Sequence, residues 1–131
     1  MQVNHPEDSD FLLASETKRI IGIGFEIYNQ LGIGFLEIVY KDAFEFEFRK
    51  GGILFEREKQ YEIKYKGIVL PHKFYADFIV FDSVILEVKC QAGISEADLA
   101  QTLNYLRCSG CKVGLILNFG KQKLEIKRVI L

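Results

Sequence analysis

Hydrophobic positions along the first 50 residues follow a helical period. From Ser15 onward, apolar residues recur at spacings of three and four, as on the buried face of an amphipathic helix: Ile20, Ile23, Gly24, Ile27 and Leu31. The Leu31-Gly32-Ile33-Gly34 segment interrupts this pattern, and a second helix is predicted over residues 35–50, ended by two glycines. Residues 1–14 show no stable period, so we expect a loose N-terminal arm (1–14) followed by a single domain (15–131).

After Gly52 the period changes from that of helices to that of strands. Residues 61–66 alternate between apolar and charged, which is typical of a strand with one solvent-facing side. Residues 74–81 and 84–90 are richer in Phe, Val and Ile, and the Asp82-Ser83 pair between them is a turn signal. These two segments are therefore expected to form central strands joined as a hairpin.

The remainder of the chain predicts one more helix and two more strands. Ser95 and Asp98 have the spacing of a capping box, which starts a helix that continues to Gly110. Strands are expected at 113–118 and 124–130. This order of elements predicts an α+β fold in which helices flank a central sheet.

Composition and charge narrow the class of protein. The chain has 131 residues, 49% of them hydrophobic, which indicates one compact core rather than a disordered chain. It shows no apolar run near the ~18 residues of a membrane span and no secretory signal, so we expect a cytoplasmic protein with reduced cysteines and no membrane association. The net charge of -1 provides no global positive field, so nucleic-acid binding must be argued from a local site.

Three charged residues interrupt the apolar central strands. Asp77 precedes the run 78–81, and Glu87 and Lys89 follow the run 84–86. Carboxylates near buried strands are costly unless a cation or hydrogen bonds compensate them. Two carboxylates beside a lysine suit a hard divalent cation and metal-assisted hydrolysis of a phosphodiester. An ordinary Glu/Lys pair on a solvent-facing strand fits the same spacing.

The metal-site hypothesis makes a demand on strand register. With a strict two-residue turn at Asp82 and Ser83, Asp77 would face Val88 and lie on the opposite side of the sheet from Glu87. The hypothesis therefore requires a three-residue loop, or a bulge, between residues 81 and 84.

Polar residues on two helices can join the same site. Glu37 and Tyr40 share one face of the second predicted helix, and Gln101 and Tyr105 share one face of the last. Each also has a structural explanation, because a glutamate suits a helix N-terminus and a tyrosine can be half-buried with its hydroxyl in water.

Together these motifs resemble a known family. The segment GFLEIVY at residues 34–40 is similar to the signature of the GxxExxY family, within the PD-(D/E)XK nuclease superfamily. The resemblance continues in order to about residue 130, through YADFIV at 75–80, LEVK at 86–89, QTLNYL at 101–106 and VGLILNFG at 113–120. It implies a restriction-endonuclease-like core with the order α-β-β-β-α-β and a mixed central sheet flanked by helices.

The resemblance also implies a function and a role for individual residues. It implies an Mg²⁺- or Mn²⁺-dependent nuclease that hydrolyses phosphodiester bonds of nucleic acid, with DNA preferred, and Lys89 positioning the attacking water. The implied metal ligands are Glu37, Asp77, Glu87 and the Val88 carbonyl. The implied catalytic residues, of which the last two match the QxxxY element of RecB-like nucleases, are Glu37, Asp77, Glu87, Lys89, Gln101 and Tyr105.

Two other interpretations remain open at this point. A catalytically silent module could bind nucleic acid or a protein partner on the same fold, and a homodimer is compatible with either function. The complete acid set favours the enzyme, whereas the lack of net positive charge favours the binding module. The third and weaker interpretation is a redox or metal protein based on Cys108 and Cys111, a lone CxxC with no second ligand pair.

Overall fold

The fold is taken from a computed structural model that describes residues 12–131, so the predicted arm lies mostly outside the described residues. The helices are α1 (Ala14–Leu31), α2 (Glu37–Lys50) and α3 (Glu96–Ser109). The strands are β1 (Phe55–Tyr61), β2 (Lys64–Tyr65), β3 (Ile68–Val69), β4 (Phe74–Val80), β5 (Val84–Lys89), β6 (Val113–Asn118) and β7 (Glu125–Ile130). With β2 and β3 set aside, the order from α2 to β6 is α-β-β-β-α-β.

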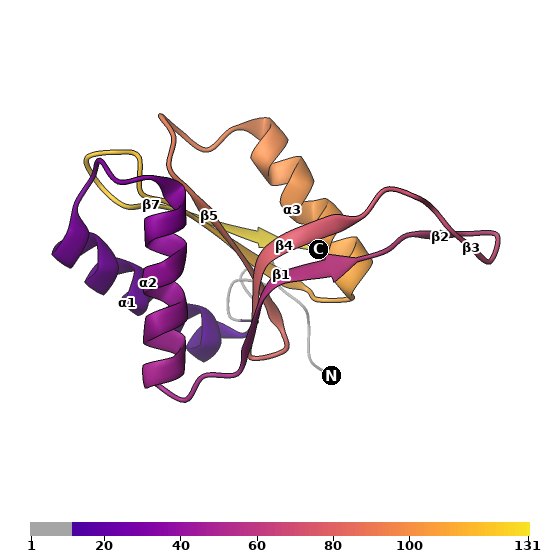
Figure 1. The fold of residues 1–131 in the computed structure, drawn as a ribbon, viewed down its shortest axis with the longest axis horizontal. Coiled ribbons are helices and arrows are strands. Elements are labelled where there is room, and N and C mark those ends of the chain that lie inside the picture. Colours follow the sequence, from indigo (N-terminus) through magenta and orange to yellow (C-terminus); the bar gives the residue numbers. More distant parts are fainter. Residues whose placement is uncertain (1–11) are drawn as a thin grey trace, which may run out of the picture.

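Five strands form one mixed sheet in the order β1-β4-β5-β6-β7. The β5–β6 pair is parallel, and the other three pairs are antiparallel. Helices α1 and α2 cover one face of the sheet and α3 covers the other (Figure 1). The predicted α+β fold with a mixed sheet between helices is therefore confirmed.

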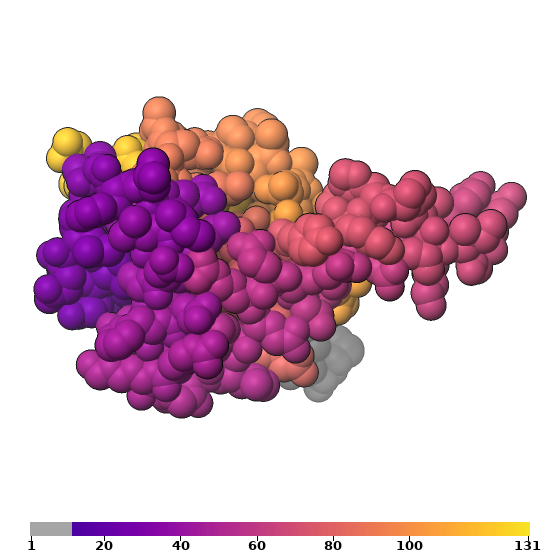
Figure 2. All heavy atoms as spheres, in the orientation of Figure 1, coloured from indigo at the N-terminus to yellow at the C-terminus, as the bar shows by residue number. Residues whose placement is uncertain are grey.

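The prediction of a strand at residues 61–66 is wrong. The sheet strand is β1, which ends at Tyr61, and β2 and β3 form a small separate hairpin. That hairpin turns at Lys66 and Gly67, which both have positive φ, as a two-residue turn requires. Residues 62–73, which contain this hairpin, extend away from the body of the molecule (Figure 2).

The charged residues of β1 explain why this strand was not predicted from the sequence. Its half-buried positions include Arg57 and Lys59, whose aliphatic stems can cover the sheet while their charged ends reach solvent or a partner. The Arg57 guanidinium lies 5.8 Å from the centroid of the Phe78 ring and pairs with Asp42 at 2.7 Å. A search for alternating apolar residues does not recognise such a strand.

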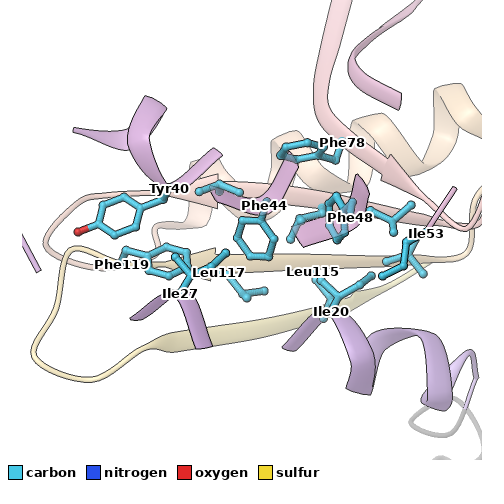
Figure 3. Packing of buried hydrophobic residues seen from close by; sticks show 14 residues of the cluster. Ile20, Ile27, Tyr40, Phe44, Phe48, Ile53, Phe78, Leu115, Leu117 and Phe119 are labelled. Carbon is cyan, nitrogen blue, oxygen red and sulfur yellow. The ribbon is translucent and has the colours of Figure 1, made fainter. Parts of the chain in front are cut away.

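Aromatic rings fill the space between the sheet and helices α1 and α2. Figure 3 shows rings from α2 packed against residues of β4 and β6, with Tyr40 at one end of the row. The Tyr40 and Phe119 rings stack with centroids 4.5 Å apart. Gly24 allows α1 to approach the sheet, because a Cβ there would lie 2.4 Å from a Leu117 methyl carbon.

Helix α3 is fixed over the other face. The predicted capping box is present, with the Ser95 hydroxyl accepting from the Asp98 N–H and the Asp98 carboxylate accepting from the Ser95 N–H. A second, smaller apolar cluster lies beneath it, and includes Ile85, Tyr105 and Leu106. Asp98 also lies 3.8 Å from the Lys89 ammonium, which connects the start of α3 with the end of β5.

Candidate active site

The regular pairing of strands β4 and β5 ends at Asp77 and Glu87, the two carboxylates predicted to bind a metal ion together. The regular pairs run from Val80 with Val84 to Phe78 with Leu86, so the loop between the strands has three residues. Two of those residues, Phe81 and Asp82, have positive φ. This is the register that the metal-site hypothesis requires, because it places Asp77 opposite Glu87.

Where the two strands part, carboxylate side chains accept the N–H groups that backbone carbonyls would accept in a regular sheet. The Asp77 N–H donates to Glu87 Oε2 at 2.8 Å, and the Val88 N–H donates to Asp77 Oδ2 at 2.8 Å. Asp77 is 8% exposed and Glu87 is 2% exposed. Each carboxylate thus satisfies an N–H of the opposite strand, which offsets part of the cost of burying it.

A lysine that the sequence did not single out lies among the carboxylates. The Lys41 ammonium is 2.8 Å from Asp77 Oδ1 and 3.4 Å from a carboxylate oxygen of both Glu37 and Glu58. Burial alone would lower the pKa of Lys41, but the hydrogen bond and charge of Asp77, with Glu58 and Glu37, raise it above its ordinary value. Lys41 is therefore a charged, buried part of the site. The spacing of four between Glu37 and Lys41 was the available signal.

Glu58 is the second residue that sequence reasoning missed. It lies opposite Asp77 in β1, between the pairs Arg57–Phe78 and Lys59–Ala76, but its φ of 54° interrupts the regular pairing. Non-glycine residues in this conformation cost of order 1–3 kcal/mol and persist only where the surrounding structure enforces them. No sequence signal marks this position, because the conformation arises from the packing of β1 on β4.

We call Glu37, Lys41, Glu58, Asp77 and Glu87 the carboxylate junction. Its residues come from α2, β1, β4 and β5, which are separated in sequence and meet only in the folded chain. The alternation of β4 changes there as well: residues 76 and 79 both join the cluster under α3, whereas regular alternation would separate them. The irregular backbone therefore coincides with the buried charges.

Burial and electrostatics single out Glu87 and Tyr105. Burial raises the pKa of Glu87 to about 8, and the neighbouring Asp77 charge acts in the same direction. Burial also raises the pKa of Tyr105 well above its usual range, with further contributions from Glu87 and Asp77. The Tyr105 ring packs edge-on against Phe74 at 6.3 Å. Tyr105 thus stays neutral beside the junction and can act as a hydrogen-bond donor or acceptor.

Lys89 and Gln101 form a separate polar pair at the edge of this site. The Lys89 ammonium donates to Gln101 Oε1 at 3.4 Å and lies 3.8 Å from Asp98 Oδ1, so its contacts are with α3. Of the predicted residues, the structure therefore joins Asp77 with Glu87 directly and Lys89 with Gln101. Glu37 reaches Asp77 only through the Lys41 ammonium.

Tyr40 has a structural position rather than a place at the site. It is fully buried, its hydroxyl donates to the Gly32 carbonyl at 2.6 Å, and the same oxygen accepts the Phe35 N–H at 3.3 Å. The expectation of a half-buried ring with a hydroxyl in water is wrong, because the loop before α2 closes around that hydroxyl. Tyr40 thereby fixes the loop that leads into Glu37.

The donor set fits a hard divalent cation in type but is not preassembled around one. Asp77, Glu87 and the Val88 carbonyl offer oxygen ligands of the kind that Mg²⁺ and Mn²⁺ prefer. Within residues 12–131, however, no three Asp, Glu, His or Cys side chains are grouped so that they could hold a metal ion. The Lys41 ammonium occupies the position where Glu37, Glu58 and Asp77 converge.

The three cysteines form no part of this arrangement. Cys90, Cys108 and Cys111 are all free thiols, and Cys111 is buried. Burial raises the pKa of the Cys108 thiol, which disfavours the thiolate that a zinc site or redox motif needs.

Comparison with known proteins agrees with this fold. A crystal structure described as "Crystal structure of SSO0001" is similar to the chain with a TM-score of 0.57 at 19% identity, over 70% of this chain and 48% of that one. The present chain thus spans about half the length of that protein. No curated protein matches the sequence. Among the described helices, none has both the length and the hydropathy needed to cross a membrane.

A family model supplies the assignment. The model described as the PD-(D/E)XK nuclease superfamily matches residues 14–129, a span that includes all three helices and every strand apart from the last residue of β7. The chain belongs to the PD-(D/E)XK nuclease superfamily.

Proposed function

We propose that this protein is a divalent-metal-dependent nuclease that hydrolyses phosphodiester bonds of nucleic acid, with DNA as the expected substrate. The observation that carries the proposal is the pairing of Asp77 with Glu87 where β4 and β5 part, two residues before Lys89. Nucleases of this superfamily typically use divalent metals. We also propose that the chain falls in the GxxExxY group and that Gln101 and Tyr105 form its RecB-like element.

The residues of the chain divide the chemistry among them. Asp77, Glu87 and the Val88 carbonyl would hold Mg²⁺ or Mn²⁺, which would supply charge stabilisation at the phosphate and a more acidic water. Lys89 orients the attacking water and offsets negative charge that develops on the phosphate. Gln101 holds the Lys89 ammonium through its side-chain oxygen, and the neutral Tyr105 hydroxyl would help to hold the site or the phosphate in place.

One observation favours the second candidate, a catalytically silent module that binds nucleic acid. The Lys41 ammonium already contacts Asp77, Glu37 and Glu58, so each of these carboxylates has a cationic partner without a metal ion. Buried carboxylates that are neutralised in this way can be retained for structure alone. Chemistry and binding must therefore be measured separately.

The test is cleavage of single- and double-stranded DNA and RNA in the presence of Mg²⁺ or Mn²⁺. Asp77→Asn keeps the shape of the side chain and removes its charge, so we expect cleavage to fall by at least a hundredfold. The matched control is Glu96→Gln, which alters an exposed carboxylate at the start of α3 and should leave cleavage unchanged. If the wild type binds nucleic acid but cleaves none of these substrates with either metal ion, the nuclease proposal is wrong and the catalytically silent binding module is supported.

A further inference from the structure

Lys41 is a buried charge that the proposed chemistry does not use. Its side chain is 11% exposed and that of Asp77 is 12% exposed, whereas the Glu37 and Glu58 side chains are 43% and 50% exposed. The ammonium thus lies between a buried carboxylate and two that open to solvent. The solvent-exposed side of this cluster is therefore the one that carries Glu37 and Glu58.

We propose that the Lys41 ammonium takes the place of a second divalent cation, so that the site holds a single metal ion, at Asp77 and Glu87. This inference rests on the proposed function, because it concerns how many ions that site takes. It assigns Glu37 and Glu58 to Lys41 rather than to a metal. Lys41 offsets the charge of Asp77 on the side away from the one ion.

The contacts of Asp77 define two separate sides. Its Oδ1 atom accepts from Lys41 of α2, while its Oδ2 atom accepts the Val88 N–H of β5. Glu87 and Val88 lie on the second side, on the strand that also carries Lys89. A single ion bound there leaves the Lys41 contact intact, whereas an ion on the first side would have to displace the ammonium.

The positive charge of Lys41 disfavours a second ion. Within the junction Lys41 is the one cationic side chain, because the Lys89 ammonium faces Asp98 of α3 at 3.8 Å. A second ion close to the Lys41 ammonium would be repelled, since like charges this near in a partly buried site interact strongly.

The unusual backbone conformation of Glu58 coincides with its contact to Lys41. Its positive φ is unfavourable for a glutamate, yet it is adopted where the side chain reaches the Lys41 ammonium. The shorter contact of Lys41, to Asp77 at 2.8 Å, joins helix α2 to strand β4. Two elements of the sheet therefore hold the ammonium in place from different directions.

The experiment is calorimetric titration of the apo protein with Mn²⁺ alone, which reads binding without any cleavage. We expect one ion per wild-type chain and none for Asp77→Asn. Glu58→Gln should keep one ion with an affinity within about twofold, because Glu58 serves Lys41. Lys41→Met keeps much of the side-chain volume, and we expect it to bind a second ion and to tighten the first about tenfold.

The control and the opposing outcomes separate the two proposals. Lys50→Met alters an exposed lysine at the end of the same helix and should still bind one ion with the wild-type affinity. Two ions per wild-type chain, a lost ion in Glu58→Gln, or a folded Lys41→Met with wild-type binding would overturn this inference alone. If circular dichroism shows that Lys41→Met is unfolded, the same titration of Glu58→Gln and Glu37→Gln decides. One bound Mn²⁺ per chain in both variants supports the inference, and a lost ion in either overturns it. A wild type that binds no Mn²⁺ would overturn the metal-dependent function itself.

Discussion

The aromatic core and the carboxylate junction lie next to each other and are held together in different ways. In the core, residues such as Phe44, Phe48 and Phe78 are fully buried and contact several rings each. In the junction, each buried charge has a specific partner, as Asp77 has in Lys41 and in the Val88 N–H. Helix α2 contributes to both regions, with its aromatic residues in one and Glu37 and Lys41 in the other.

The difference concerns which changes each region tolerates. Packing in the core is nearly non-directional, so its stabilisation depends on buried area and on the absence of cavities. In the junction the cost of a change depends on what remains unpaired, because a buried charge that loses its partner is expensive. The core should therefore respond to size, and the junction to charge and protonation.

The largest expected effect is in the core. Phe44→Ala removes a ring that lies 5.6 to 6.2 Å from those of Phe48, Phe78 and Phe119, and should cost about 3–5 kcal/mol of unfolding free energy. Phe46→Ala on the same helix is the matched control. Phe46 is 62% exposed, so its loss should cost under about 0.5 kcal/mol.

Urea denaturation followed by circular dichroism measures both variants. Similar losses for Phe44→Ala and Phe46→Ala would mean that burial in the aromatic cluster does not dominate the stability of this domain.

The contrast between the regions also explains how much of the fold the sequence predicts. The capping box at Ser95 and the apolar runs of β4 and β5 are local patterns, and the structure has them where they were predicted. Strand β1 was missed because Arg57 and Lys59 occupy its half-buried positions. Such a strand is recognisable only once the sheet that it covers is known.

For the candidate site, the sequence predicts the charged residues on the strands but not how they are neutralised. Asp77 and Glu87 stand out because they interrupt apolar runs, and the three-residue loop follows from requiring them to meet. Lys41 and Glu58 lie in segments rich in charge, where neither residue is unusual. Their roles depend on α2 and β1 meeting at Asp77, which is a tertiary contact.

The pH dependence of stability is a second property that distinguishes the junction from the aromatic core. The pKa of Glu87 is raised from 4.5 to about 8 by burial and by Asp77, so the folded state binds a proton there that the unfolded state releases. This contribution to stability is fully present below about pH 4.5 and is lost as the pH rises through about 8. The lowered pKa values of Asp98 and Glu125 act in the opposite direction and only at lower pH.

Urea denaturation of the apo protein from pH 5 to pH 8 tests this expectation. The wild type should lose stability across the range, and Glu87→Gln, which stays neutral, should lose much less. Glu96→Gln is the control for an exposed carboxylate and should follow the wild type. An equal decline in Glu87→Gln and the wild type would mean that another group titrates.

The smallest expected effect is at Tyr40, which stacks on Phe119 in the aromatic core and directly precedes Lys41 of the junction in sequence. Tyr40→Phe keeps the ring on Phe119 but removes the hydroxyl that bonds the Gly32 carbonyl and the Phe35 N–H, and should cost about 1–2 kcal/mol. Tyr28→Phe is a matched control, since the Tyr28 hydroxyl donates to the Lys121 carbonyl in an exposed bond that water can replace. We expect a loss under about 0.5 kcal/mol for that variant. Equal losses in thermal or urea denaturation would show that Tyr40 contributes only its ring, and that the loop before Glu37 is held by other contacts.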